Sequence, residues 1–172
     1  MTPSHLGLSA GDLAAELNAQ QGGALTSFKK SSFELLSKTP WADNVGSWDT
    51  PAKDEPTWVS RWRGGWQLCA PSTGEADPQS EEPAFHGAAS QASWNVISSD
   101  SLSATLEWQD AKGVFSITRR WVLEPPNRVR VETAMKNLSR ESQRYGVAEH
   151  LILGSDFLEP CRRGLAAKLD FS

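Results

Sequence analysis

Alternating apolar and polar residues form the clearest pattern, in the middle of the chain. Three runs alternate in this way, residues 102–109, 114–123 and 129–136, and short segments rich in Asp, Gly, Pro and Asn separate them. A period of two residues is typical of a strand with one buried face. The pattern therefore predicts a three-stranded antiparallel meander. The residues expected on its buried face are Leu102, Ala104, Leu106, Trp108, Phe115, Ile117, Trp121 and Leu123.

Shorter runs on either side extend the prediction to an all-β fold. Residues 94–98 and 145–153 are each expected to form a strand. Residues 11–20 are ambiguous, because their Ala and Leu content favours a helix while their apolar residues also alternate. A Gly-Gly pair follows and suits a tight turn, so we expect a hairpin with residues 24–29 as its second strand.

Residues 40–92 differ from the rest of the chain. They are rich in Pro, Gly, Ser and Trp and show little periodicity. The chain has eight Trp residues, and five of them lie between Trp41 and Trp66. Because a long irregular segment in a compact domain is usually functional, candidate binding residues are expected here.

Length and charge limit the class of protein. A chain of 172 residues can form one domain with a hydrophobic core. The net charge of −4, from 17 Lys+Arg and 21 Asp+Glu, argues against a nucleic-acid partner. No apolar run approaches about 18 residues, so we expect no membrane span. The first residues lack the basic and apolar blocks of a secretory signal, and we expect a cytoplasmic protein.

Cysteine and glycosylation signals are weak. Cys69 and Cys161 could form one disulfide, but a reducing compartment without it is the favoured expectation. The sequence Asn137-Leu138-Ser139 has the glycosylation pattern, which matters only in a secreted protein.

Two histidines are candidates for chemistry. His86 lies at the end of the irregular segment, and His150 lies within the last predicted strand. Such a histidine is often a hydrogen-bonded core residue. The alternative is that both imidazoles meet in one cleft as acid, base or ligand-orienting groups. Only two possible metal ligands are placed here, so we expect no metal.

The segment Arg61-Trp62-Arg63-Gly64-Gly65-Trp66 is the second candidate. It can be a tight glycine turn with tryptophans packed beneath it. It can also be a binding segment, in which Arg63 donates to sugar hydroxyls while Trp62 and Trp66 stack on sugar rings. No Lys-Ser/Thr pair follows the glycines, so the segment is no phosphate-binding loop.

The order of these residues resembles the aldose 1-epimerase, or galactose mutarotase-like, superfamily. The matching series is Arg63-Gly64-Gly65-Trp66, Pro71, Gly74, His86-Gly87, Trp94 and, after Asn137-Leu138-Ser139, Glu149-His150-Leu151-Ile152-Leu153-Gly154. It covers residues 60–155 and is similar in part to hexose-6-phosphate 1-epimerases. The early Gly22-Gly23-Ala24-Leu25 resembles the hairpin with which the family begins.

The resemblance implies a large antiparallel β-sandwich that binds a small-molecule sugar and interconverts its α and β anomers without a cofactor. In that family a carboxylate removes the anomeric hydroxyl proton while a histidine protonates the ring oxygen. By carry-over, His150 matches the acid and His86 matches a histidine that holds or polarises the sugar. Arg63, Trp62 and Trp66 are then the expected substrate-binding residues.

Two departures from the family pattern refine these expectations. Ser90 occupies the place of an Arg found in the phosphosugar branch, which favours an unphosphorylated sugar. No residue matches the family's catalytic Glu, and Glu149 should point away from His150 because strand neighbours face opposite sides. We therefore expect residues 1–172 to be the N-terminal portion of one longer sandwich domain, with residues 165–171 beginning another strand.

Two alternatives to an enzyme of this kind stay open. One is a carbohydrate-binding β-sandwich without catalysis. The other is an accessory sandwich domain of a polysaccharide-active enzyme, since fold alone does not settle function.

Overall fold

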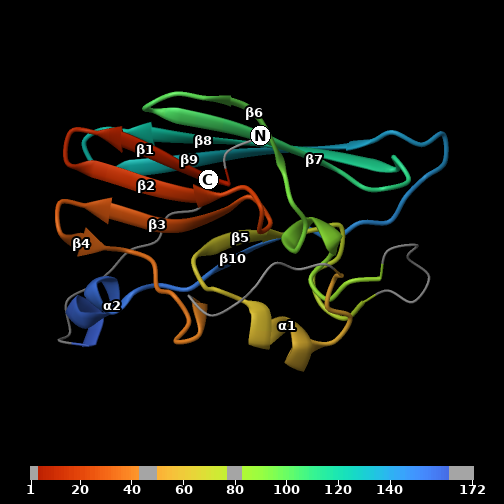
Figure 1. Cartoon of the computed structure of the whole chain (residues 1–172), viewed down its shortest axis with the longest axis horizontal. Helices are drawn as coiled ribbons and strands as arrows, with labels where there is room; N and C mark the ends of the chain where they lie inside the picture. The colour runs from red at the N-terminus through yellow and green to blue at the C-terminus, as the bar shows by residue number, and fades with distance from the viewer. Residues whose placement is uncertain (1–3, 43–49, 77–82, 163–172) are drawn as a thin grey trace.

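Two antiparallel β-sheets form a sandwich in the computed structural model, which describes residues 4–42, 50–76 and 83–162 (Figure 1). The first sheet contains β1 (His5–Ala10), β2 (Leu13–Asn18), β3 (Ala24–Lys30), β5 (Trp66–Cys69) and β10 (Ala148–Leu151) in that order, with β4 (Phe33–Glu34) paired to β3. The second sheet contains β6 (Asn95–Ser99), β7 (Ser103–Gln109), β8 (Phe115–Glu124) and β9 (Arg128–Asn137). The expected all-β sandwich is confirmed.

Three short helices complete the described structure. They are α1 (Glu55–Arg61), η2 (Ala88–Ser90), which is a 3-10 helix, and α2 (Ser155–Arg162). In Figure 1, α1 and α2 lie at the lower side of the molecule, beyond β5 and β4.

The main hydrophobic core lies between the two sheets. Alternation along each strand directs one set of side chains inward, and fully burying a large apolar side chain contributes about 1.5–3 kcal/mol. The fully buried large side chains of this core include Leu8, Leu13, Leu17, Leu25, Leu68, Leu106, Ile117 and Trp121. A second, smaller cluster consists of Ala52, Trp58 and Phe85, with Val59 and Trp62 packed against it.

The predicted meander is present as β7, β8 and β9. Its registers place Trp108 opposite Ile117 and Trp121 opposite Val131. Seven of the eight residues expected on its inner face are buried. The prediction was wrong for Leu102, which is 46% exposed because it precedes β7 in a turn. Its backbone N–H donates to the Asp100 carboxylate at 2.7 Å.

The ambiguous segment near the start is a strand, as expected, and forms a hairpin with β3. Ala15 lies opposite Phe28, and both side chains are buried in the core. Gly22 and Gly23 form the turn with φ values of 66° and 57°. A Cβ at Gly22 would lie 2.3 Å from the Ser90 carbonyl oxygen, so the turn also needs glycine for lack of space.

The sequence patterns miss β1, β4, β5 and all three described helices, and they predict a longer strand than β10. Both β5 and α1 are short and lie in the segment without periodicity, and Trp58 is the buried residue of α1. The Asp54 carboxylate caps α1 by accepting from Thr57 N at 2.9 Å. Tyr145 was expected in a strand but precedes β10 and is 65% exposed. The predicted strand at 165–171 lies outside the described residues.

Candidate functional site

The pairing of β10 with β5 places His150 on the outer face of the first sheet. His150 lies opposite Gln67, while Glu149 lies opposite Leu68, which is buried in the core. Consecutive strand residues point to opposite faces, so Gln67 and His150 share the outer face. The expectation that Glu149 points away from His150 is confirmed.

A tightly held loop brings His86 to the same place. His86 has a φ of 59°, a backbone conformation that is uncommon outside glycine. Its N–H donates to the Gly74 carbonyl at 2.8 Å, and Phe85 N donates to the Ala52 carbonyl at 2.9 Å. The buried amide of Gln91 bridges these segments, because it donates to the carbonyls of Phe85 (2.8 Å) and Ala52 (3.1 Å). These hydrogen bonds thus hold the loop in place around His86.

Helix α1 supplies Trp58, which contacts both histidines, and its C-terminal cap supplies Trp62, which contacts His150. Trp58 lies 4.6 Å from His86 and 5.7 Å from His150 between ring centroids. Trp62 stacks on His150 at 4.5 Å with an interplanar angle of 24°. The two imidazoles are 5.5 Å apart. Segments distant in sequence thus bring two histidines and two indoles into one group, which we call the histidine–tryptophan cluster: Trp58, Trp62, His86 and His150.

Several buried polar atoms of this cluster have no hydrogen-bond partner within the described part of the chain. They are the Nδ1 atoms of His86 and His150, the indole Nε1 atoms of Trp58 and Trp62 and, beside them on the sheet, Nε2 of Gln67. Buried polar groups are normally paired, and each unpaired one costs about 1–3 kcal/mol. His86, His150 and Trp62 are nevertheless only partly buried, so the exposed parts of their rings suit a ligand with hydroxyl groups and apolar C–H faces.

Burial changes the charge of both imidazoles. It lowers the pKa of His86, although a hydrogen bond to the Thr73 backbone and the nearby Glu55 carboxylate act in the opposite direction. It also lowers the pKa of His150, and the proximity of His86 lowers it further. Both rings are therefore mainly neutral at pH 7, and a proton bound by one disfavours a proton on the other.

The sequence-predicted residues do not all join the cluster. His86, His150 and Trp62 do. Arg63 follows Trp62 in the connection to β5, is partly buried, and its carbonyl accepts from Thr39 N at 3.0 Å. Trp66 faces the interior instead, where its ring meets Trp121 at 5.2 Å.

Two residues of the site, Trp58 and Gln67, were not predicted from the sequence. Trp58 gave no signal that distinguishes it from the other tryptophans of the irregular segment. Gln67 could have been found only after β5 had been recognised, since strand alternation then places it on the outer face.

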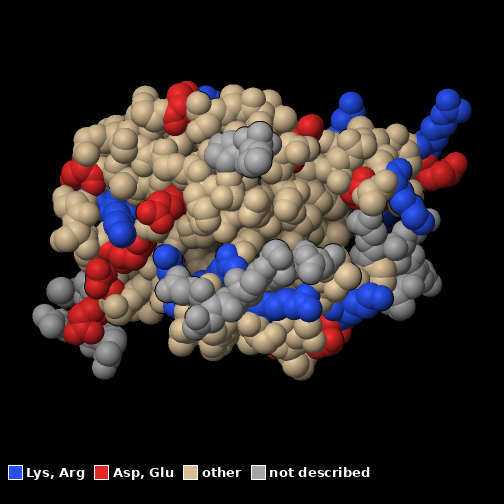
Figure 2. Space-filling model, in the orientation of Figure 1, with Lys and Arg blue, Asp and Glu red and all other residues tan. Residues whose placement is uncertain are grey.

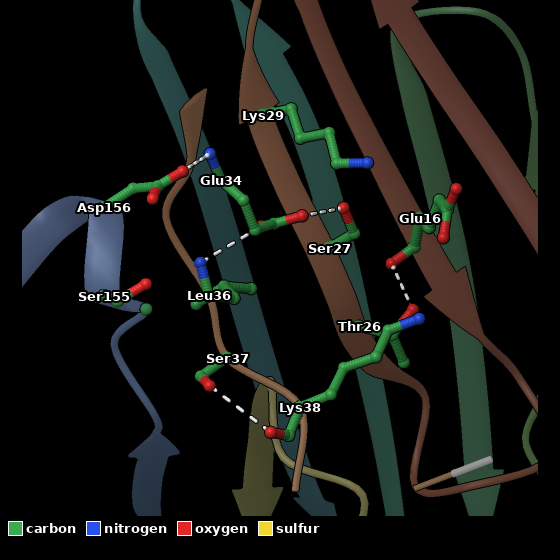
Figure 3. A pocket seen from close by; sticks show the side chains of 11 residues that line it. Glu16, Thr26, Ser27, Lys29, Glu34, Leu36, Ser37, Lys38, Ser155 and Asp156 are labelled. Carbon is green, nitrogen blue, oxygen red and sulfur yellow. Dashed lines mark hydrogen bonds between the residues drawn. The ribbon is translucent and has the colours of Figure 1, made fainter. Parts of the chain in front are cut away.

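A separate hollow of about 330 Å³ lies over β2, β3 and β4, and it shares no lining residue with the cluster (Figure 3). Lys29 and Lys38 extend over it from two sides, and acidic side chains gather around it (Figure 2). The Glu34 carboxylate accepts hydrogen bonds from Ser27 Oγ, from Phe28 N at 2.9 Å and from Leu36 N at 3.1 Å. Glu34 therefore fastens β4 and the following segment to β3.

No group of three or more His, Cys, Asp or Glu side chains in the described residues has the arrangement needed for a metal ion. Burial raises the pKa of the free Cys69 thiol to about 12, so it is unreactive. No helix among the described residues is long and apolar enough to cross a membrane.

Comparison with solved structures identifies the architecture as a galactose mutarotase-like β-sandwich. A galactose mutarotase-like protein from Lactobacillus casei ATCC 334 matches with a TM-score of 0.63 and 14% identity, over 87% of this chain and 49% of that one. A galactose mutarotase related enzyme from Lactobacillus acidophilus matches with 0.62 and 16%, over 86% and 48%. A proposed aldose 1-epimerase from Escherichia coli K12 matches with 0.59 and 17%, over 84% and 50%.

These matches confirm the resemblance to the aldose 1-epimerase and galactose mutarotase-like superfamily at the level of the fold. The chain spans about half the length of the structures it matches. No family model matches the sequence, and no curated protein matches it significantly.

Proposed function

We propose that this chain belongs to an aldose 1-epimerase that interconverts the α and β anomers of an unphosphorylated sugar. The observation that carries the proposal is the meeting of His86 and His150 on one sheet face, 5.5 Å apart between ring centroids. The partly exposed imidazoles and the adjoining indoles suit a sugar ring, which combines hydroxyl groups with apolar C–H faces. The mutarotase-like fold supports the same proposal.

In the proposed reaction, the minor fraction of His150 that is protonated at pH 7 donates its proton to the ring oxygen as the C1–O bond breaks. A base removes the proton of the anomeric hydroxyl, so that C1 becomes a carbonyl. Rotation about C1–C2 and reversal of these proton transfers close the ring on the other face. Each well-placed proton transfer contributes about 10²–10⁴-fold to the rate. His86 polarises or holds the sugar, and Trp62 binds it.

The base is not assigned to any described residue. Glu149 is the carboxylate nearest to His150 in sequence, but it points inward and is bound by Arg119 at 3.0 Å. This observation favours the second candidate function, a carbohydrate-binding sandwich without catalysis.

Polarimetry tests the proposal directly. The full-length protein that contains this chain, added to freshly dissolved α-D-glucose or α-D-galactose, should accelerate mutarotation, and His150→Gln should abolish the acceleration. His5→Gln is the matched control, because His5 is an exposed histidine on β1 and should leave the rate unchanged.

Sugar binding separates the two candidate functions. Titration of tryptophan fluorescence with the same sugars measures binding to the protein. Binding without acceleration of mutarotation would support the binding module and contradict the enzyme. Neither binding nor acceleration with common aldoses would contradict both.

A further inference from the structure

An ion pair between the buried Arg119 and the partly exposed Glu149 joins the two sheets behind the candidate site. Arg119 lies on β8 between Ile117 and Trp121, and its exposed fraction is 0%. Its Nη2 lies 3.0 Å from Glu149 Oε2, and its guanidinium carbon lies 4.7 Å from the centroid of the Trp121 ring. Trp66 Nε1 donates to the same Oε2 at 2.6 Å. One carboxylate on β10 thus connects β8 in the second sheet with β5 in the first.

Arg119 depends strongly on this carboxylate. Its Nε and Nη1 have no hydrogen-bond partner among the described residues. A buried guanidinium that loses its carboxylate is left without compensation, so the ion pair strongly favours the position of β10 that preserves it. β10 pairs with β5 only over Ala148–Leu151. The ion pair therefore contributes much of the interaction that holds this short strand in position.

We propose that Arg119 is a positioning residue for His150, an inference that rests on the proposed function. The contact that holds Glu149 inward also holds the next residue, His150, outward. His150 is thereby kept opposite Gln67 and beneath Trp62. A charged group inside the sandwich therefore orients an imidazole on its outer surface without touching the sugar.

The first test compares Arg119→Met with Arg120→Met in the full chain. Arg120 is the matched control because it is the next residue on β8, half exposed, and paired with Glu132 at 3.6 Å. Arg119→Met should speed amide hydrogen exchange at residues 148–151 and shift the NMR resonance of the His150 Cε1 proton. It should lower kcat about 10²-fold with little change in KM, since displacement of a reacting group by about 1 Å has this effect. Arg120→Met should change none of these.

The double variant Arg119→Met/Glu149→Met separates positioning from stability. Apolar side chains of similar volume can replace a buried ion pair without loss of stability. We expect the double variant to unfold near the wild-type urea midpoint while exchange, the His150 resonance and kcat stay perturbed. Glu149→Gln keeps an acceptor oxygen for Arg119 and Trp66 and should restore most of the wild-type resonance.

A wild-type His150 resonance and wild-type exchange at residues 148–151 in the double variant would overturn the proposal. These two measurements need no catalysis. A wild-type chain without mutarotase activity would therefore refute the proposed function, while the exchange and NMR results would still decide whether Arg119 positions His150.

Discussion

Truncation of Trp58 should detach α1 from the sheet and disperse the histidine–tryptophan cluster. Trp58 is 2% exposed and contacts Trp62, Phe85, His86 and His150. An indole buries about 150–250 Å², which at about 25 cal/mol per Å² corresponds to about 4–6 kcal/mol. Measured truncations of buried Trp to Ala cost about 3–5 kcal/mol, so Trp58→Ala should lower stability by that amount.

The loss should be local as well as global. Trp58 is the buried residue of α1, so this helix has little else to hold it. Urea unfolding measures the change in the free energy of unfolding, and hydrogen exchange at residues 55–62 measures the release of the helix. Trp58→Phe is the matched control, because it keeps an aromatic ring and removes an Nε1 that has no described partner. A change below about 0.5 kcal/mol in Trp58→Ala, with wild-type exchange at α1, would refute the reasoning.

Three further predictions concern protonation, the buried thiol and the first sheet. Burial holds the pKa of His86 and His150 below the unfolded value of 6.5, so the unfolded chain binds more protons there. The free energy of unfolding should therefore fall as the pH drops below about 6.5, and replacing both residues by Gln should weaken this dependence in urea titrations. In a Cys161→Ser background, Cys69 should resist Ellman's reagent at pH 8 until the protein is unfolded; rapid labelling would contradict its burial. Glu34→Ala should cost about 2–5 kcal/mol in urea unfolding, because two backbone N–H groups lose their acceptor, and Glu34→Gln should cost less.

Strand alternation explains why much of the second sheet was predictable. The period of two is a local property of the sequence, so the side of the sheet on which a residue lies can be predicted without the rest of the fold. This holds for the buried residues Ala104, Leu106, Ile117 and Trp121. The same local rule correctly predicted that the side chain of Glu149 points away from that of His150.

The contacts between distant segments were not predictable in this way. Arg119 occupies an inward position by alternation, but a charged residue type argues against burial, and its partner Glu149 lies on another sheet. Trp66 was assigned to the sugar cleft because it neighbours Arg63 and its turn. Since β5 was not recognised, its inward direction could not be inferred.

The backbone of His86 has a consequence for ligand binding. With a φ of 59° next to Gly87, this residue sits in a left-handed conformation that few side chains adopt. A Cβ at Gly87 would lie 2.1 Å from the Ala70 carbonyl oxygen, so the loop is pressed directly against the end of β5. The conformational entropy of ordering His86 is therefore lost when the chain folds. A ligand that meets this imidazole finds it preorganised, and its affinity is not reduced by the need to order the loop.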